Sequence, residues 1–356
     1  MFTNLDAAAD SGRRYHMVVP ENTEQAATIY QYSNLTLTLD DFKDTWAGIF
    51  GCNRERVRKS KHDQCDEAEY SRTGAKLLPG IRVLLQEQAM SDRVTVEIRN
   101  HVAEVTLNRP EKHNAVDLAM IEALIAAGES LADDTSVRAV VLHGAGENFC
   151  AGIDLSVFQG AGIDGLDKQA FQPRDGSPAN FFQSAAYVWR ALPVPVIAAI
   201  RGVAFGAGLQ IALGADIRYA TSDARFSIME IKWGIIPDMA ITLTLRDVMP
   251  VDRIKELAYS GRIIASSEAE KVGLITSVRE DPLDAARGLA AEIAGKSPDA
   301  IRAIKGLINN AWHDSVEGAL QREAELQIKV MAAPNHTEAV KANLEKRSAE
   351  FLDTGS

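Results

Sequence analysis

Hydrophobic and polar residues alternate in two short runs, 94–98 and 102–107, as they do in half-buried strands. Asn100 and His101 lie between these runs, and two residues between two strands are enough for a hairpin turn. The pattern therefore predicts a β-hairpin. Asp117 then precedes apolar residues at helical spacing, so we expect it to cap a helix.

Two further runs, 137–142 and 196–200, are almost continuously apolar. A strand that is buried on both faces of a parallel sheet needs such a sequence. A helix over 179–192 is expected between them, and a third strand over 216–220. This alternation of strands and helices predicts an α/β fold in layers.

The last third of the chain has a mostly helical pattern, which predicts a helical C-terminal region. The expected helices are 251–259, 268–272, 283–294, 299–312, 317–331 and 337–351. We therefore divide the chain into an N-terminal extension (1–89), a core (90–285) and a C-terminal helical region (286–356).

The first 89 residues show no sustained periodicity and no catalytic signature. Two interpretations are open for them. They form a poorly ordered or accessory arm, or the natural protein starts at Met90, which a well-patterned strand follows.

The composition narrows the classes of function. The chain has 49 acidic and 38 basic residues, a net charge of -11, so it lacks the clustered cations that nucleic-acid binding needs. Its three cysteines are too few for a disulfide framework, which fits a reducing cytoplasm. No apolar run is long enough to span a membrane, and the N-terminus lacks the apolar segment of a secretory signal. We expect a cytoplasmic protein that binds neither membrane nor nucleic acid.

Two glycine-rich turns, 143–155 and 202–208, each follow a buried strand. Neither is a dinucleotide-binding fingerprint, because Phe149 stands where GxGxxG needs glycine. Such turns are often only tight strand–helix connections. Two neighbouring turns can also direct backbone N–H groups at one carbonyl oxygen and stabilise an oxyanion.

Several motifs now carry a resemblance. Asn108-Arg-Pro-Glu-Lys-His-Asn-Ala115 resembles the NRPxxxNA motif of the crotonase (enoyl-CoA hydratase/isomerase) superfamily. Phe149-Cys-Ala-Gly-Ile-Asp-Leu155 is similar to its first oxyanion turn, and 202–208 is similar to its second. The resemblance covers residues 93 to about 280, is consistent with the helical tail to about 350, and leaves 1–89 outside.

The resemblance implies a crotonase fold, which is a spiral of ββα units with a C-terminal helical trimerisation region. It implies an acyl-CoA substrate whose thioester enolate is stabilised by the backbone amides of Ile153 and Ala207. The second position is more often glycine in the family, so the Ala207 methyl group would narrow the site. Coenzyme A is then part of the substrate, with no metal or redox cofactor, and the protein is a homotrimer or a dimer of trimers.

Acid–base chemistry on an acyl chain needs carboxyl groups with raised pKa values beside the reacting carbon. Hydratases of this superfamily have two glutamates, at the positions of Gln210 and Glu230 here. Glutamine cannot exchange a proton at neutral pH, although it can hold a water molecule. The two-glutamate scheme for hydration is therefore incomplete.

Asp238 offers a second carboxylate. The dienoyl-CoA isomerases of the superfamily have Glu and Asp at the positions of Glu230 and Asp238, and a further Asp at the position of Gln210. On a purely structural interpretation, Asp238 is an N-cap before the apolar run that follows it. Cys150 is expected to pack as a small hydrophobic residue, since no histidine that would activate it is evident.

We therefore expect an enzyme that isomerises a double bond of an enoyl-CoA in fatty-acid or related acyl-CoA metabolism. Glu230 is the principal acid/base, Asp238 its partner and Gln210 a polar positioning group. One alternative is an enoyl-CoA hydratase that uses Glu230 and a water held by Gln210. A second is a non-catalytic acyl-CoA binder, against which the presence of both carboxylates argues.

Overall fold

The structure is a computed structural model that describes residues 2–8, 14–20, 70–71, 74–78, 81–82, 93–159 and 168–354. The chain divides into two compact units, Met1–Ala89 and Met90–Ser356. The first unit contains an antiparallel pair, β1 (Phe2–Ala8) and β2 (Arg14–Pro20), and a small antiparallel sheet of β3 (Tyr70–Ser71), β4 (Gly74–Leu78) and β5 (Ile81–Arg82). Most residues of the expected N-terminal extension, 1–89, lie outside the described residues.

The second unit is built on a six-stranded sheet in the order β14-β11-β9-β8-β7-β6. Its strands are β6 (Val94–Arg99), β7 (Val102–Leu107), β8 (Ala139–Gly144), β9 (Val196–Ile200), β11 (Ile217–Ala220) and β14 (Ser277–Val278). Strands β6 and β7 form the predicted antiparallel hairpin, and the other neighbours are parallel. Asn100 and His101 both have positive φ, 50° and 66°, as the two turn residues of a type I′ hairpin require.

Each buried strand contributes side chains to two cores. Along β8, Val140 and Leu142 belong to the main core, whereas Ala139 and Val141 belong to a second core under helix α10 (Pro282–Ala294). Alternate residues of a strand face opposite sides of the sheet. The continuous apolar runs of the sequence are therefore explained by a sheet that is covered on both faces.

Helices α3 (Leu118–Asp133) and α5 (Phe181–Ala191) pack on each other, and their buried side chains belong to the main core. The Asp117 side chain accepts a 2.8 Å hydrogen bond from the backbone N–H of Met120, so the predicted cap is confirmed. Helix α5 starts with a capping box between Asn180 and Gln183.

A second, three-stranded sheet carries the second glycine-rich turn. It consists of β10 (Val203–Phe205), β12 (Arg225–Ser227) and β13 (Ile264–Ala265), and α6 (Ala207–Leu213) follows β10 directly. The remaining short elements are η1 (Pro110–Lys112), α4 (Ser156–Gln159), η3 (Lys168–Phe171), η4 (Glu230–Trp233), α7 (Ile241–Thr244), α8 (Val251–Ser260) and α9 (Ser266–Lys271).

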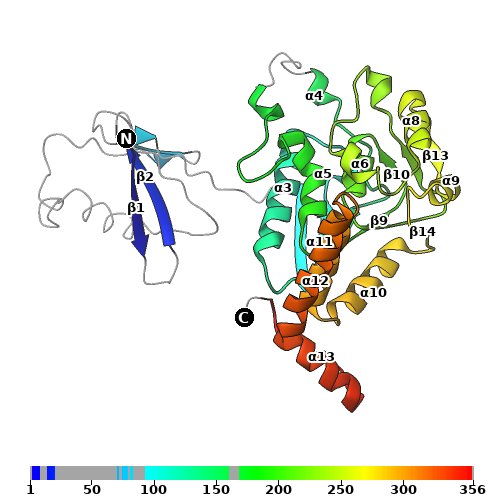
Figure 1. Cartoon of the computed structure of the whole chain (residues 1–356). Helices are drawn as coiled ribbons and strands as arrows, with labels where there is room; N and C mark the ends of the chain where they lie inside the picture. Colours follow the sequence, from blue (N-terminus) through cyan, green and yellow to red (C-terminus); the bar gives the residue numbers. More distant parts are fainter. Residues whose placement is uncertain are drawn as a thin grey trace, which may run out of the picture. The chain divides into compact units, whose positions relative to one another are not determined.

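The C-terminal region consists of α11 (Pro298–Ala311), α12 (Val316–Ala332) and α13 (Pro334–Glu345), and α13 projects beyond the sheet layers in Figure 1. A buried ammonium group anchors α11, since Lys305 Nζ lies 2.8 Å from the Asp216 carboxylate and donates to the backbone oxygens of Trp189 and Val194.

The prediction of a helix over 337–351 is wrong at both ends, since α13 spans Pro334–Glu345. Pro334 occupies the first turn of α13, where a missing N–H costs nothing. The helix ends at Glu345 because Lys346 adopts a left-handed conformation, with φ of 54°. In the part of the chain that the structure describes, every helix is too short or too polar to cross a membrane.

Candidate functional site

The first glycine-rich turn is held between two other segments. Cys150 forms a parallel bridge to Ala204 of β10, so it joins this turn to the second one. Three residues later, Ile153 bridges Val116. The Asp154 N–H and the Gly152 carbonyl both bond to Val116, at 2.8 Å each. Because neighbouring peptides of an extended chain point in opposite directions, the Ile153 N–H points away from Val116.

Glycine is required where the two turns meet. Gly152 has φ of +101°, and a β-carbon added there would lie 2.9 Å from the Phe205 carbonyl oxygen and 3.9 Å from the Ala207 nitrogen. Gly206 has φ of 50° and ψ of -120°, a conformation that L side chains rarely adopt. At Gly152 and Gly206 the two turns therefore approach each other through their backbones. Elsewhere a side chain links them, since Asn148 Oδ1 of the first turn accepts the Val203 N–H of the second at 3.0 Å.

The predicted donor Ala207 is the first residue of α6. A residue at this position has no hydrogen-bond acceptor within its own helix. Within residues 93–159 and 168–354, neither the Ile153 N–H nor the Ala207 N–H is engaged by another backbone group. Both amides are thus available to an oxyanion, with the N-terminal end of a helix dipole behind one of them.

Glu230 lies beside this helix terminus. A β-carbon added to Gly206 would lie 3.3 Å from Glu230 Oε1. The carboxyl group is buried, with only 6% of the residue exposed, and burial raises its pKa above the ordinary glutamate value. Its other oxygen, Oε2, is also buried and has no hydrogen-bond partner among the described residues.

Gln210 connects this carboxylate to the next segment. Its side-chain oxygen accepts the Met239 backbone N–H at 2.8 Å, which orients the amide. The side-chain nitrogen therefore faces Glu230 Oε1 and donates to it at 2.6 Å. Oε1 is an acceptor in this bond, so a proton carried by Glu230 resides on Oε2.

Asp238 precedes Met239 in the same segment, and its side chain is exposed. Partial desolvation nevertheless raises its pKa, and its negative charge raises the pKa of Glu230. The N-cap interpretation is wrong: the N-cap of α7 is Ala240, and no side chain caps that helix. The structure thus brings Gln210, Glu230 and the Asp238–Met239 peptide together beside the second turn.

Cys150 is fully buried, and burial raises the pKa of its thiol to about 12. Its Sγ donates to the Asn114 carbonyl oxygen at 3.0 Å. A thiol that stays protonated is a poor nucleophile, so this geometry supports a packing role.

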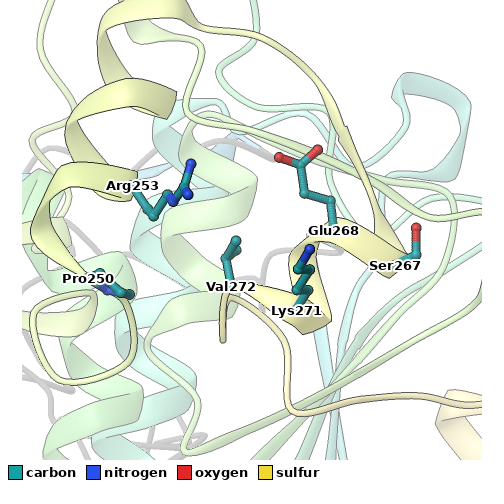
Figure 2. Close-up of a pocket in the computed structure, with 6 residues that line it drawn as sticks. All are labelled: Pro250, Arg253, Ser267, Glu268, Lys271 and Val272. Atoms are coloured by element: carbon teal, nitrogen blue, oxygen red, sulfur yellow. The ribbon is translucent and has the colours of Figure 1, made fainter.

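A pocket of about 620 Å³ lies apart from these residues, between α8 and α9 (Figure 2). Its lining is Pro250, Arg253, Ser267, Glu268, Lys271 and Val272. None of the site residues predicted from the sequence lines it. Within the described ranges, no group of His, Cys, Asp and Glu is arranged to hold a metal ion.

Some contributors were not assigned a role from the sequence. Arg109, Asn114 and Asp154 belong to the quoted motifs. The side chains of Arg109 and Asn114 bond to the first turn, and Asp154 is a residue of that turn whose carboxylate accepts from Arg109 and from the Ser156 N–H. Asp154 is the one charged residue of an otherwise apolar motif, whereas Arg109 and Asn114 lie in a mostly polar motif and carry no such signal. The Met239 N–H that orients Gln210 has no sequence signal, because it belongs to the backbone.

Comparison with known proteins identifies the family. The family model described as enoyl-CoA hydratase/isomerase matches residues 97–354. The chain therefore belongs to the enoyl-CoA hydratase/isomerase family and is an enzyme of the crotonase superfamily. The family connects it to acyl-CoA and fatty-acid metabolism.

Individual relatives differ in the reaction that their names give. The chain is 35% identical to the mitochondrial Delta(3,5)-Delta(2,4)-dienoyl-CoA isomerase of Mus musculus, over 71% of this chain and 80% of that protein. It is 33% identical to the enoyl-CoA hydratase EchA19 of Mycobacterium tuberculosis, over 72% and 95%.

Solved structures confirm the crotonase fold. The crystal structure of enoyl-CoA hydratase from Bacillus anthracis has a TM-score of 0.67 at 31% identity, covering 73% of this chain and 98% of that one. DspI of Pseudomonas aeruginosa has a TM-score of 0.68 at 30% identity, covering 75% and 100%.

Proposed function

We propose that this protein moves double bonds in an enoyl-CoA thioester, as a dienoyl-CoA isomerase does. The substrate's thioester oxygen binds between the amides of Ile153 and Ala207. Glu230 and Asp238 exchange protons with the acyl chain. Coenzyme A is part of the substrate, and the reaction needs no other cofactor.

The observation that carries this proposal is the hydrogen bonding of the Gln210 side-chain amide. Its amide bridges Glu230 Oε1 and the Met239 N–H, so it is a structural link between two segments. Addition of water across a double bond requires one group to activate the water and a proton to be delivered to carbon. An amide in the position of the second glutamate does neither, whereas isomerisation requires only that a proton leave one carbon and return to another.

The isomerisation follows from these positions. Glu230 Oε2 removes a proton from the carbon next to the thioester carbonyl of a 3,5-dienoyl-CoA. The electron pair moves into the carbonyl, and the resulting enolate oxygen is stabilised by the two amides. The electrons return as a proton is added at the far end of the conjugated system, which yields the 2,4-dienoyl ester. Asp238 in its protonated form donates that proton, and its raised pKa favours this form more than in an ordinary aspartate. The proton taken up by Glu230 then returns to Asp238 by way of solvent, which restores both groups for the next turnover.

Hydration of a 2-enoyl-CoA is the second candidate. The names of EchA19 and of the Bacillus anthracis neighbour favour it, as does Glu230 beside the second turn. In that case the remaining N–H of Gln210 would hold the water molecule, and Glu230 would act on it alone.

The test is a paired absorbance assay of the purified protein with a 2-enoyl-CoA and a 3,5-dienoyl-CoA. Isomerisation extends the conjugation of the dienoyl ester into the carbonyl, whereas hydration removes the conjugation of the 2-enoyl ester. We expect fast turnover of the dienoyl ester and slow turnover of the 2-enoyl ester. The reverse result would make the protein a hydratase. Tight binding of both esters without turnover would make it a non-catalytic binder.

The proposed assembly is a homotrimer or a dimer of trimers. Its support is a series of exposed apolar side chains along the C-terminal helices. They include Ile304, Trp312, Leu320, Ile328 and Leu344. A monomer rarely leaves so much apolar surface in water. Light scattering during gel filtration measures the mass, and a mass equal to that of one chain would refute this assembly.

A further inference from the structure

The loop 108–115 has a fixed internal shape. His113 and Asn114 both have positive φ, 51° and 55°, which turns the chain back on itself. The Asn114 side-chain oxygen accepts the Arg109 N–H at 2.8 Å and closes this turn. A turn stabilised in this way presents the side chains of Arg109 and Asn114 to the same neighbouring segment.

Asn114 fixes the beginning of the first glycine-rich turn. Its residue surface is fully buried, and its side-chain nitrogen lies 2.9, 2.8 and 3.2 Å from the carbonyl oxygens of Ala145, Asn148 and Phe149. The two N–H donors of this amide thus serve three backbone carbonyls of the turn, with one hydrogen shared between two of them, and these carbonyls would otherwise be costly to bury.

Arg109 fixes the other end of the same turn. Its Nη1 lies 2.5 Å from Asp154 Oδ2 and also donates to the Ala115 carbonyl oxygen at 3.1 Å. Both charged side chains are mostly buried, with 12% of Arg109 and 15% of Asp154 exposed. Such a pair is screened much less by water than a surface ion pair.

Asp154 is the residue directly after Ile153, whose N–H is the proposed oxyanion donor. The other carboxylate oxygen, Asp154 Oδ1, accepts the Ser156 N–H at 2.9 Å, and the Asp154 N–H is bonded to Val116. Asp154, which follows Ile153, is therefore held both by its backbone N–H and by its side chain. Within residues 93–159 and 168–354, the Ile153 N–H itself is bonded to no other backbone group.

We propose that Arg109 and Asp154 are positioning residues for the oxyanion hole: their buried ion pair holds the Ile153 N–H at the angle at which it donates to the thioester oxygen. This inference rests on the proposed function, since it assumes that an acyl-CoA carbonyl binds there. Neither side chain touches the reacting atoms, and both act through the backbone of the turn.

The expected size of the effect follows from oxyanion chemistry. Removing one oxyanion donor costs about 10²–10³-fold in kcat. Losing the ion pair tilts the donor without removing it, so we expect a loss of about 10–100-fold in kcat. The proposal places the pair behind the backbone of the turn, so we expect binding of the CoA portion to change little.

The experiment compares Arg109→Met, Asp154→Asn and Arg109→Lys with Arg287→Met as a matched control. Arg287 forms a bidentate ion pair with Glu104 at the α10 face of the sheet. Glu104 also lies 3.1 Å from His143 Nε2 at the start of the first turn, so this control removes an Arg–carboxylate pair beside the turn and leaves the Arg109–Asp154 pair in place. Each protein is tested for kcat and KM, for affinity for a saturated acyl-CoA, and for the infrared carbonyl frequency of that bound thioester, labelled with ¹³C at the carbonyl carbon.

A polarised carbonyl absorbs at lower frequency than a free one. We expect Arg109→Met and Asp154→Asn to lose most of this frequency shift and to retain affinity within about threefold, with partial recovery in Arg109→Lys. Arg287→Met should keep the full shift. If Asp154→Asn, which preserves shape, keeps the full shift and kcat, the positioning role is refuted. If the unsubstituted protein itself shows no shift on binding, the proposed oxyanion hole fails instead.

Discussion

The two sides of the site differ in how their polar groups are satisfied. On the side of the first turn, the buried side chains of Asn114, Arg109 and Asp154 all have hydrogen-bond partners. On the side of residues 230–240, Glu230 Oε2 has no partner among the described residues, and the Asp238 carboxyl is exposed. The first side is therefore rigid, and the second carries groups whose charge can change.

The apolar side chains of the two regions also differ, in how far they are exposed to solvent. Ile231 and Ile236, which lie between Glu230 and Asp238 in the sequence, are 48% and 75% exposed. Phe149 in the first turn is only 1% exposed. A donor for an oxyanion must be fixed before the reaction, because its value depends on preorganisation. An acid or base must instead tolerate two protonation states, which costs stability in the folded protein. The division of the site between two regions follows from these opposite demands.

The largest effect is expected for Glu230→Gln, which removes the base and keeps the shape. We predict a loss of about 10³-fold in kcat, within the range for general acid–base catalysis, with binding of a saturated acyl-CoA retained. Stopped-flow turnover and calorimetric binding measure the two quantities.

The same variant has a predicted effect on stability. The pKa of Glu230 is raised in the folded protein, so the folded state binds its proton more tightly than the unfolded state. The free energy of unfolding therefore falls as pH rises from the ordinary glutamate pKa to the raised one, and stays lower above it. Glutamine removes this penalty, so the urea midpoint at pH 7 should rise. A lower midpoint would mean that Glu230 stabilises the fold.

Asp238→Asn tests the second carboxylate and its coupling to the first. We predict a loss of about 10²-fold in kcat, because no group returns the proton. Asp238 raises the pKa of Glu230, so its removal should lower that pKa. The acidic limb of the kcat/KM profile, where Glu230 becomes protonated and inactive, should then move to lower pH. An unchanged profile with full activity would remove Asp238 from the mechanism.

Gln210→Glu introduces the second glutamate of the hydratase pattern. Glutamate keeps an oxygen for the Met239 N–H, but two adjacent carboxyl groups cannot both ionise easily, so they share a proton. We predict that isomerisation falls by about tenfold and that hydration of a 2-enoyl-CoA increases. Gln210→Met, which has similar length and neither polar group, serves as the control. If both variants hydrate no faster than the parent protein, the residue at position 210 does not decide the reaction.

Much of this fold was predictable because its signals are local. The hairpin at Asn100 and His101 and the cap at Asp117 depend on neighbouring residues, and both are present. The end of the last helix was not predictable, because apolar spacing continues past Lys346 while the left-handed conformation of that residue ends the helix.

Prediction of the site from the sequence meets the same limit, because only local signals can be recognised. The motifs placed Glu230 and Gln210 near the second turn, and the structure brings them within 2.6 Å of each other. The orientation of the Gln210 amide depends on a backbone N–H of residue 239, which no side-chain pattern encodes. The exposed Asp238 side chain and the absence of a cap likewise depend on the path of the loop before α7.

Ala207→Gly is expected to have the smallest effect. It separates the contribution of the Ala207 backbone N–H from that of the Ala207 methyl group. The donor at this position is a backbone N–H, which glycine keeps, so kcat should change by less than about threefold, against 10²–10³-fold for a lost donor. Glycine lowers helix stability by at most about 1 kcal/mol, which a urea titration measures. A loss of kcat close to that of a missing donor would show that the buried Ala207 methyl group holds the helix terminus in place. The second turn would then depend on packing, as the first depends on its ion pair.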